Sequence, residues 1–186
     1  FFFSLAPRPG KSEIAFLSVR SGALKVMSML TDTRHVNLLL QPKAGSIPSS
    51  LAYSKNGDRL AISTWNPTSQ SSEVFMTSKN GGRLELAFSL PAKVDDLVWA
   101  PAGDELVLTS SPVGGPDNSG LYIVRLDGQC LRPLTFNPSM DRHPQFSPDG
   151  RNLIYSSQRD GQRQLYSLEF RPPPCPPPST PLTSKE

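Results

Sequence analysis

The chain is poor in the residue types on which most catalytic and metal sites depend. It contains two histidines, His35 and His143, and two cysteines, Cys130 and Cys175. It has no Gly-x-Ser-x-Gly, Cys-x-x-Cys, His-Glu-x-x-His or EF-hand pattern, which mark hydrolase nucleophiles and zinc or calcium sites. We therefore expect no catalytic site, metal or cofactor in this chain. Two free thiols are the default expectation, because pairing would require the proline-rich end to fold back beside the third repeat.

Charge of one sign and long apolar runs are also missing. The 19 Lys and Arg residues are scattered among 16 Asp and Glu residues, giving a net charge of +3 without a run of five like charges. A mixed, solvated surface explains this pattern better than the basic stripe of a nucleic-acid-binding protein. No segment reaches the roughly 18 to 20 apolar residues that cross a bilayer. The sequence predicts neither nucleic-acid binding nor a membrane span.

What the sequence does contain is a repeat. Four similar apolar runs begin at Ile14, Leu60, Leu106 and Leu153, at spacings of 46, 46 and 47 residues. Self-similarity at such a period is typical of repeat architectures, in which each unit buries its apolar face by stacking on a neighbour. The runs read IAFLS, LAIST, LVLTS and LIYSS.

Each of the last three runs follows an aromatic residue and a glycine turn. Proline, Asn or Asp followed by glycine favours a tight hairpin, because glycine adopts the positive φ that such a turn requires. Gly10 takes this place in the first unit. The aromatic residues are Tyr53, Trp99 and Phe146, and the glycines are Gly57, Gly103 and Gly150.

Two further strands follow in most units. Segments 24–29, 73–77, 121–126 and 164–170 predict a third strand, and the short runs 37–40, 83–86 and 130–134 predict a fourth. Four short antiparallel strands per unit form the blade of a β-propeller, and sustained helical periodicity is absent. We predict an all-β propeller with about four blades, at about 1–45, 46–88, 89–137 and 138–170. Residues 171–186 form a proline-rich arm or include the last strand of the fourth blade.

The last repeat resembles a known family. Phe146-Ser147-Pro148-Asp149-Gly150-Arg151, with the strand and hairpin that follow it, is similar to the repeat of TolB-like propellers, also called WD40-like or PD40 repeats. The second and third units have Lys55-Asn56 and Pro101-Ala102 where the family has Pro-Asp. The resemblance covers about 1–170 and implies a larger ring of six or more blades, of which this chain would be a fragment. A closed four-bladed ring is the alternative. The resemblance to TolB-like propellers also implies a docking role in the bacterial envelope, in a periplasmic or secreted location.

Superposing the repeats suggests a binding face. Ser50, Asp96 and His143 each stand three residues before the recurring aromatic of their unit, and Ser49, Asp95 and Arg142 precede them. The first strand of a blade commonly lines the central channel, so these side chains are expected at one mouth of it. Varied polar residues on a rigid repeat scaffold often form a binding surface. We predict a partner-binding site of Ser50, Asp95, Asp96, Arg142 and His143; the alternative is that they are only solvated loop residues.

Three further expectations concern local structure. His143 precedes Pro144, which favours an extended backbone. Trp65 is expected in a loop outside the repeat register, and long loops are expected at 66–72 and 111–119.

The predicted function is a non-enzymatic scaffold that binds a protein or peptide. The alternative is the gating propeller of a prolyl-oligopeptidase- or dipeptidyl-peptidase-like serine peptidase, whose catalytic Ser, Asp and His would lie outside this chain. A fragment would also leave the faces of its end blades uncovered, so we expect it to self-associate.

Overall fold

The protein is built from strands. The computed structural model describes residues 4–19, 24–77, 83–111, 119–136 and 139–175, and these contain no helix. In the same residues, therefore, no helix of membrane-spanning length and apolar character is found.

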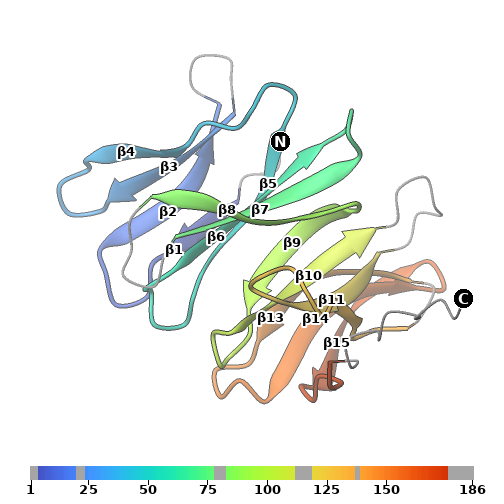
Figure 1. Cartoon of the computed structure of the whole chain (residues 1–186). Coiled ribbons are helices and arrows are strands. Elements are labelled where there is room, and N and C mark those ends of the chain that lie inside the picture. Colours follow the sequence, from blue (N-terminus) through green and yellow to red (C-terminus); the bar gives the residue numbers. More distant parts are fainter. Residues whose placement is uncertain (1–3, 20–23, 78–82, 112–118, 137–138, 176–186) are drawn as a thin grey trace, which may run out of the picture.

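Four antiparallel sheets follow one another along the chain (Figure 1). Each is a meander in which consecutive strands pair, as expected for propeller blades, although sheet 4 has three strands in the described residues. Sheet 1 contains β1 (Leu5–Pro7), β2 (Glu13–Ser18), β3 (Lys25–Leu30) and β4 (Val36–Leu40); sheet 2 contains β5 (Ile47–Tyr53), β6 (Leu60–Asn66), β7 (Ser71–Thr77) and β8 (Leu84–Leu90); sheet 3 contains β9 (Lys93–Trp99), β10 (Glu105–Ser111), β11 (Gly120–Arg125) and β12 (Arg132–Pro133); sheet 4 contains β13 (Met140–Phe146), β14 (Asn152–Arg159) and β15 (Gln162–Glu169).

The first strands of the sheets are the inner strands. β5 contacts both β1 and β9, and β9 contacts β13, so the four sheets fan out from a shared inner face. Sheets 1 and 4 lie at opposite ends of the row (Figure 1).

The glycine turns hold neighbouring sheets close. Gly57 and Gly150 have φ values of 73° and 75°, as the hairpin pattern predicts. A Cβ at Gly57 would lie 2.5 Å from the carbonyl oxygen of Pro9, and one at Gly150 would lie 2.9 Å from Pro101. Each glycine therefore permits both the turn and the contact with the turn of the preceding sheet.

The core lies between the sheets. Leu106 and Leu108 face sheet 2 and pack with Ala61 and Val74, and all four are fully buried. The Trp99 indole crosses the same interface, where its Nε1 donates a hydrogen bond to the Ala52 carbonyl oxygen at 2.9 Å. The predicted aromatic of the inner strand thus packs between two sheets.

Trp65 contradicts the sequence expectation. It lies within β6, paired with Ile47 and Ser72, because β6 continues beyond the repeat motif to Asn66. The connection to β7 shortens accordingly to 67–70. Most of the other expected loop, 112–118, lies outside the described residues.

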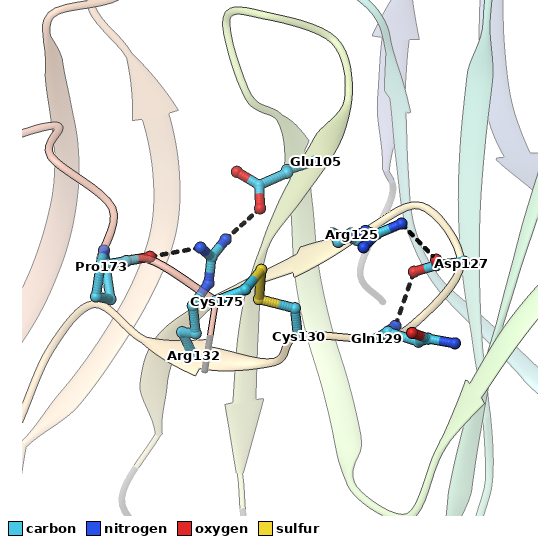
Figure 2. The surroundings of a disulfide bond; sticks show 8 residues. All are labelled: Glu105, Arg125, Asp127, Gln129, Cys130, Arg132, Pro173 and Cys175. Atoms are coloured by element: carbon cyan, nitrogen blue, oxygen red, sulfur yellow. Dashed lines mark hydrogen bonds and ion pairs between the residues drawn. A yellow bond between two sulfur atoms is a disulfide. The ribbon is translucent and has the colours of Figure 1, made fainter. Parts of the chain in front are cut away.

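The expectation of two free thiols was also wrong. Cys130 and Cys175 form a disulfide that closes a separation of 45 residues (Figure 2). Beside it, the Arg132 guanidinium donates to the Glu105 carboxylate and to the Pro173 carbonyl oxygen. Arg132 is only 7% exposed, and a buried cation requires such acceptors. The backbone carbonyl groups of a proline-rich segment are free of internal hydrogen bonds, and that of Pro173 serves as one of these acceptors. The proline-rich arm therefore lies beside sheet 3.

The first prediction concerns this disulfide. Replacing both cysteines, in the variant Cys130→Ser/Cys175→Ser, should lower the free energy of unfolding by about 2–4 kcal/mol, because the loop constraint on the unfolded chain is lost. Urea unfolding measures the loss. Dithiothreitol should destabilise the wild type to the same level and leave the double variant unchanged; an equal response of both proteins would contradict the prediction.

Candidate functional site: the inner face

A groove runs along the inner face of the sheets. Its volume is about 450 Å³, and residues of all four sheets line it. Leu51, Trp99 and Phe146 contribute apolar parts of the wall, while Lys55 and Gln145 provide polar groups. The lining comes from the second halves of the inner strands and from the glycine turns that follow them.

Tyr53 gives the groove a neutral polar group. Burial, reinforced by the Glu13 carboxylate and opposed by Arg8, raises the pKa of the Tyr53 phenol from 10.0 to about 12. Arg8 lies over the Tyr53 ring at 5.7 Å and pairs with Glu13 at 2.8 Å. Tyr53 therefore stays protonated at neutral pH and can both donate and accept a hydrogen bond.

The residues predicted from the repeats lie at the other ends of the inner strands. None of them lines the groove. In β5 and β9 the pairing with the second strand shifts register at Ser49 and Asp95, and in β13 it shifts at His143 and Pro144. Such bulges redirect side chains away from the regular ladder.

Ser50 and Asp96 join neighbouring sheets. The Leu51 N–H donates to Ser4 Oγ at 3.2 Å, and the Leu97 N–H donates to Ser50 Oγ at 3.1 Å. Each bond links a residue to one 47 positions later. Asp96 Oδ2 continues the series by accepting the backbone N–H of His143 at 3.1 Å. The start of each inner strand thus supplies the acceptor for the next sheet.

His143 does not have the extended backbone expected before proline. Its φ is 54°. In sheets 2 and 3 the corresponding residues, Leu51 and Leu97, donate their N–H groups to the preceding sheet. Pro144 stands at this position in sheet 4, and proline has no N–H to donate. The positive φ accompanies a bond made by the N–H of His143 itself, which fills the place of the missing donor.

The junction of sheets 3 and 4 carries the charged part of the predicted site. Asp95 pairs with Lys93 at 2.7 Å and lies 3.8 Å from the Arg142 guanidinium. His143 is exposed, and its Nδ1 lies 3.1 Å from Ser156 Oγ. The structure therefore brings Asp95, Asp96, Arg142 and His143 together, whereas Ser50 is 7% exposed at the junction of sheets 2 and 3.

Asp96, His143 and Ser156 are not arranged as a catalytic triad. Ser156 Oγ lies 3.1 Å from the Arg142 carbonyl oxygen, to which it donates, and 3.1 Å from His143 Nδ1. Asp96 contacts the His143 backbone rather than its ring. In a triad the imidazole accepts the serine proton and the carboxylate orients the ring. In the described residues, no three His, Cys, Asp or Glu side chains gather as a metal site either.

Sequence reasoning missed the groove itself. Its lining includes the turn motifs, such as Tyr53 with Lys55 and Phe146 with Pro148, which their hairpin pattern marked only as structural. The recurrence of these turn motifs next to each inner strand could have indicated the groove, because equivalent turns of a repeat gather at one end of the fold.

Comparison with known proteins identifies the family. The family model of the TolB beta propeller domain, PD40, matches residues 10–172. The chain belongs to the TolB-like PD40 propeller family. It is 30% identical over 159 residues to a "Protein TolB homolog" of Chlorobium luteolum, and 43% identical over 49 residues to a "Tol-Pal system protein TolB" of Bordetella pertussis.

Solved structures share the TolB-like fold. A putative TolB from Agrobacterium tumefaciens matches 90% of this chain and 61% of its own, with a TM-score of 0.73 at 15% identity. Dipeptidyl peptidase 4 of Porphyromonas gingivalis matches 89% of this chain and 29% of its own, with a TM-score of 0.56 at 13% identity. The chain spans 34% of the Chlorobium relative and 11% of the Bordetella relative.

The hydrogen bonds between sheets predict the cost of losing Ser50. Ser50→Ala should lower the free energy of unfolding by about 1–3 kcal/mol, because the buried Leu97 N–H loses its acceptor. Ser69→Ala, at an exposed turn, should change it by less than about 0.5 kcal/mol. Equal urea midpoints for the two variants would show that the bond contributes nothing.

A third prediction uses the raised pKa of Tyr53. Glu13→Gln should lower this pKa, because it removes a negative charge that disfavours the phenolate. Ultraviolet titration of the phenolate measures it, with Tyr53→Phe identifying the Tyr53 signal and Glu73→Gln as control. Because the folded chain keeps this proton between pH 10 and about 12 while the unfolded chain releases it, stability should fall across that window. Identical titrations of wild type and Glu13→Gln would contradict the assignment.

Proposed function

We propose that the inner face of this TolB-like propeller binds a protein or peptide partner without chemical conversion of it. The observation that carries the proposal is the groove to which all four sheets contribute. Its volume of about 450 Å³ is within the range of about 300–1,000 Å³ typical of ligand sites.

The chemistry of the groove suits an extended peptide. Apolar walls at Leu51 and Trp99 can receive alternate side chains, while Lys55, Gln145 and the neutral Tyr53 phenol can bond the peptide backbone. Lys55 and Gln145 are exposed and can reach a ligand without disturbing the core.

The charged junction at the other end forms the rim of the proposed surface. Asp95, Arg142 and His143 present both signs of charge and an imidazole close together in space, with Arg142 3.8 Å from Asp95. Rim charges of this kind steer association and select partners more than they add affinity. Ser50 and Asp96 contribute by holding the sheets in place.

Two observations support the class of partner and the compartment. The Bordetella relative is named as a protein of the Tol-Pal system, which favours a protein partner for this chain as well. The Cys130–Cys175 disulfide favours an oxidising compartment, such as the periplasm or the extracellular space.

The gating propeller of a serine peptidase is the second hypothesis. The Porphyromonas peptidase supports it through the fold alone, at 13% identity. A Gly-x-Ser-x-Gly pattern between a strand and a helix in flanking sequence would favour this hypothesis, and further propeller repeats without one would favour the scaffold.

Peptide selection tests the scaffold proposal. Random dodecapeptides displayed on phage are selected on the chain, and the binders are titrated by fluorescence polarisation. Lys55→Glu/Gln145→Ala should weaken binding by at least about tenfold, because it removes polar groups from the groove. The matched control Lys43→Glu/Gln162→Ala, at exposed positions away from the groove, should bind as the wild type does. Equal binding by both double variants, or the absence of specific binders, would overturn the proposal.

A further inference from the structure

The groove on the inner face carries charge of one sign. Among its lining residues in the described part of the chain, Lys55 is the only charged one. Its side chain is exposed, and no described residue bonds or pairs with its ammonium group. Lys43, which is also exposed, differs because it pairs with Glu73 at 2.9 Å. The groove therefore presents a cation for which the described residues supply no anion.

Tyr53, from the same sheet as Lys55, supplies an uncharged donor to the groove. Burial, reinforced by the Glu13 carboxylate, raises the pKa of the Tyr53 phenol to about 12. The phenol therefore keeps its proton at neutral pH and can donate it to an anion. The Arg8 guanidinium over the Tyr53 ring is itself paired with Glu13 at 2.8 Å, so its charge is balanced within the fold.

Two carboxylates of the turns beside the groove already have donors. In the turn that contains Lys55, Asp58 Oδ2 accepts the Asn56 side-chain amide at 2.7 Å. In the corresponding turn of sheet 4, Asp149 Oδ1 accepts Ser147 Oγ at 2.6 Å, and this bond contributes most to lowering the pKa of the Asp149 carboxyl. These carboxylates stabilise their own turns and leave Lys55 unneutralised.

The remaining lining residues disfavour a basic peptide. In the described part of the chain no Asp or Glu lines the groove, so a Lys or Arg of a bound peptide would lose water without gaining an ionic partner. A carboxylate, by contrast, meets the Lys55 ammonium group. When a peptide covers Leu51 and Phe146, water is excluded around this pair, and the attraction becomes stronger than that of a solvent-exposed ion pair.

We propose that the peptide segment bound in the groove carries a carboxylate, which the Lys55 ammonium group and the Tyr53 phenol bind together. The inference rests on the proposed peptide-binding function and specifies the chemical class of the peptide. Each of the two donors serves one carboxylate oxygen, as charge-assisted hydrogen bonds to a carboxylate allow. Gln145 remains available to the peptide backbone. The carboxylate comes from an acidic side chain or from the C-terminus of the peptide.

A matched set of peptides tests the inference by fluorescence polarisation. A dodecapeptide selected on phage is synthesised with an amidated C-terminus, both as selected and with each Asp and Glu replaced by Asn and Gln. A third peptide combines the Asn and Gln replacements with a free C-terminus. At least one of the two peptides with a carboxylate should bind at least about tenfold more tightly than the peptide without one. Which of the two binds tightly identifies the source of the carboxylate.

Variants of the chain assign this preference to its donors. Lys55→Met should bind the peptides with and without a carboxylate equally, and Tyr53→Phe should weaken binding only of those with a carboxylate. Lys43→Met is the matched control and should keep the full preference. Added salt should weaken binding of the carboxylate peptide to the wild type and change little for Lys55→Met.

The possible failures are distinguishable. Selected peptides that contain no Asp or Glu and bind equally with and without a free C-terminus would overturn the inference and leave peptide binding intact. A preference for the carboxylate that survives Lys55→Met would do the same. Absence of specific peptide binders would overturn both the proposed function and the inference. Lys55 is exposed and Tyr53→Phe keeps the ring, so both variants should keep the wild-type melting curve.

Discussion

One hydrogen bond, repeated along the row, connects the sheets of this protein. An inner-strand N–H that no ladder partner satisfies points at the preceding sheet, where Ser4, Ser50 or Asp96 accepts it. A buried N–H without an acceptor is costly, and in sheets 1, 2 and 3 this position carries a short oxygen-bearing side chain that accepts it. In these three sheets the side chain at this position therefore serves assembly of the fold.

The junction of sheets 3 and 4 shows how the same constraint is met when a residue does not fit. Pro144 removes the regular donor, and the backbone at His143 adopts a φ of 54° so that the preceding N–H takes over. The adjoining Asp95 and Arg142 make this junction more polar than the one between sheets 2 and 3, where Ser49 and Ser63 bond each other at 2.8 Å. The junction of sheets 3 and 4 thus combines partly buried charge, from Asp95 and Arg142, with the exposed imidazole of His143.

The sequence predicted the architecture because the repeat and the turns are local. The residues that precede Gly57 and Gly150 in the sequence are enough to predict a turn with positive φ at each glycine. The spacing of the four apolar runs likewise predicts the repeat without any knowledge of contacts. The roles of Ser50 and Asp96 could not be predicted in this way, since a serine that accepts a bond from another sheet looks the same as a solvated one. The disulfide could not be predicted in this way either, because the contact beside it, from the buried Arg132 to the Pro173 carbonyl group 41 residues away, exists only in the folded chain.

The Cys130–Cys175 bond also changes how the row of sheets comes apart. Here the cross-link encloses β13, β14 and β15 in one covalent loop anchored to sheet 3. Tension applied at Cys175 is therefore transmitted to sheet 3 without passing through β15. Sheet 4 is therefore shielded from tension applied at Cys175, and the load passes to sheet 3.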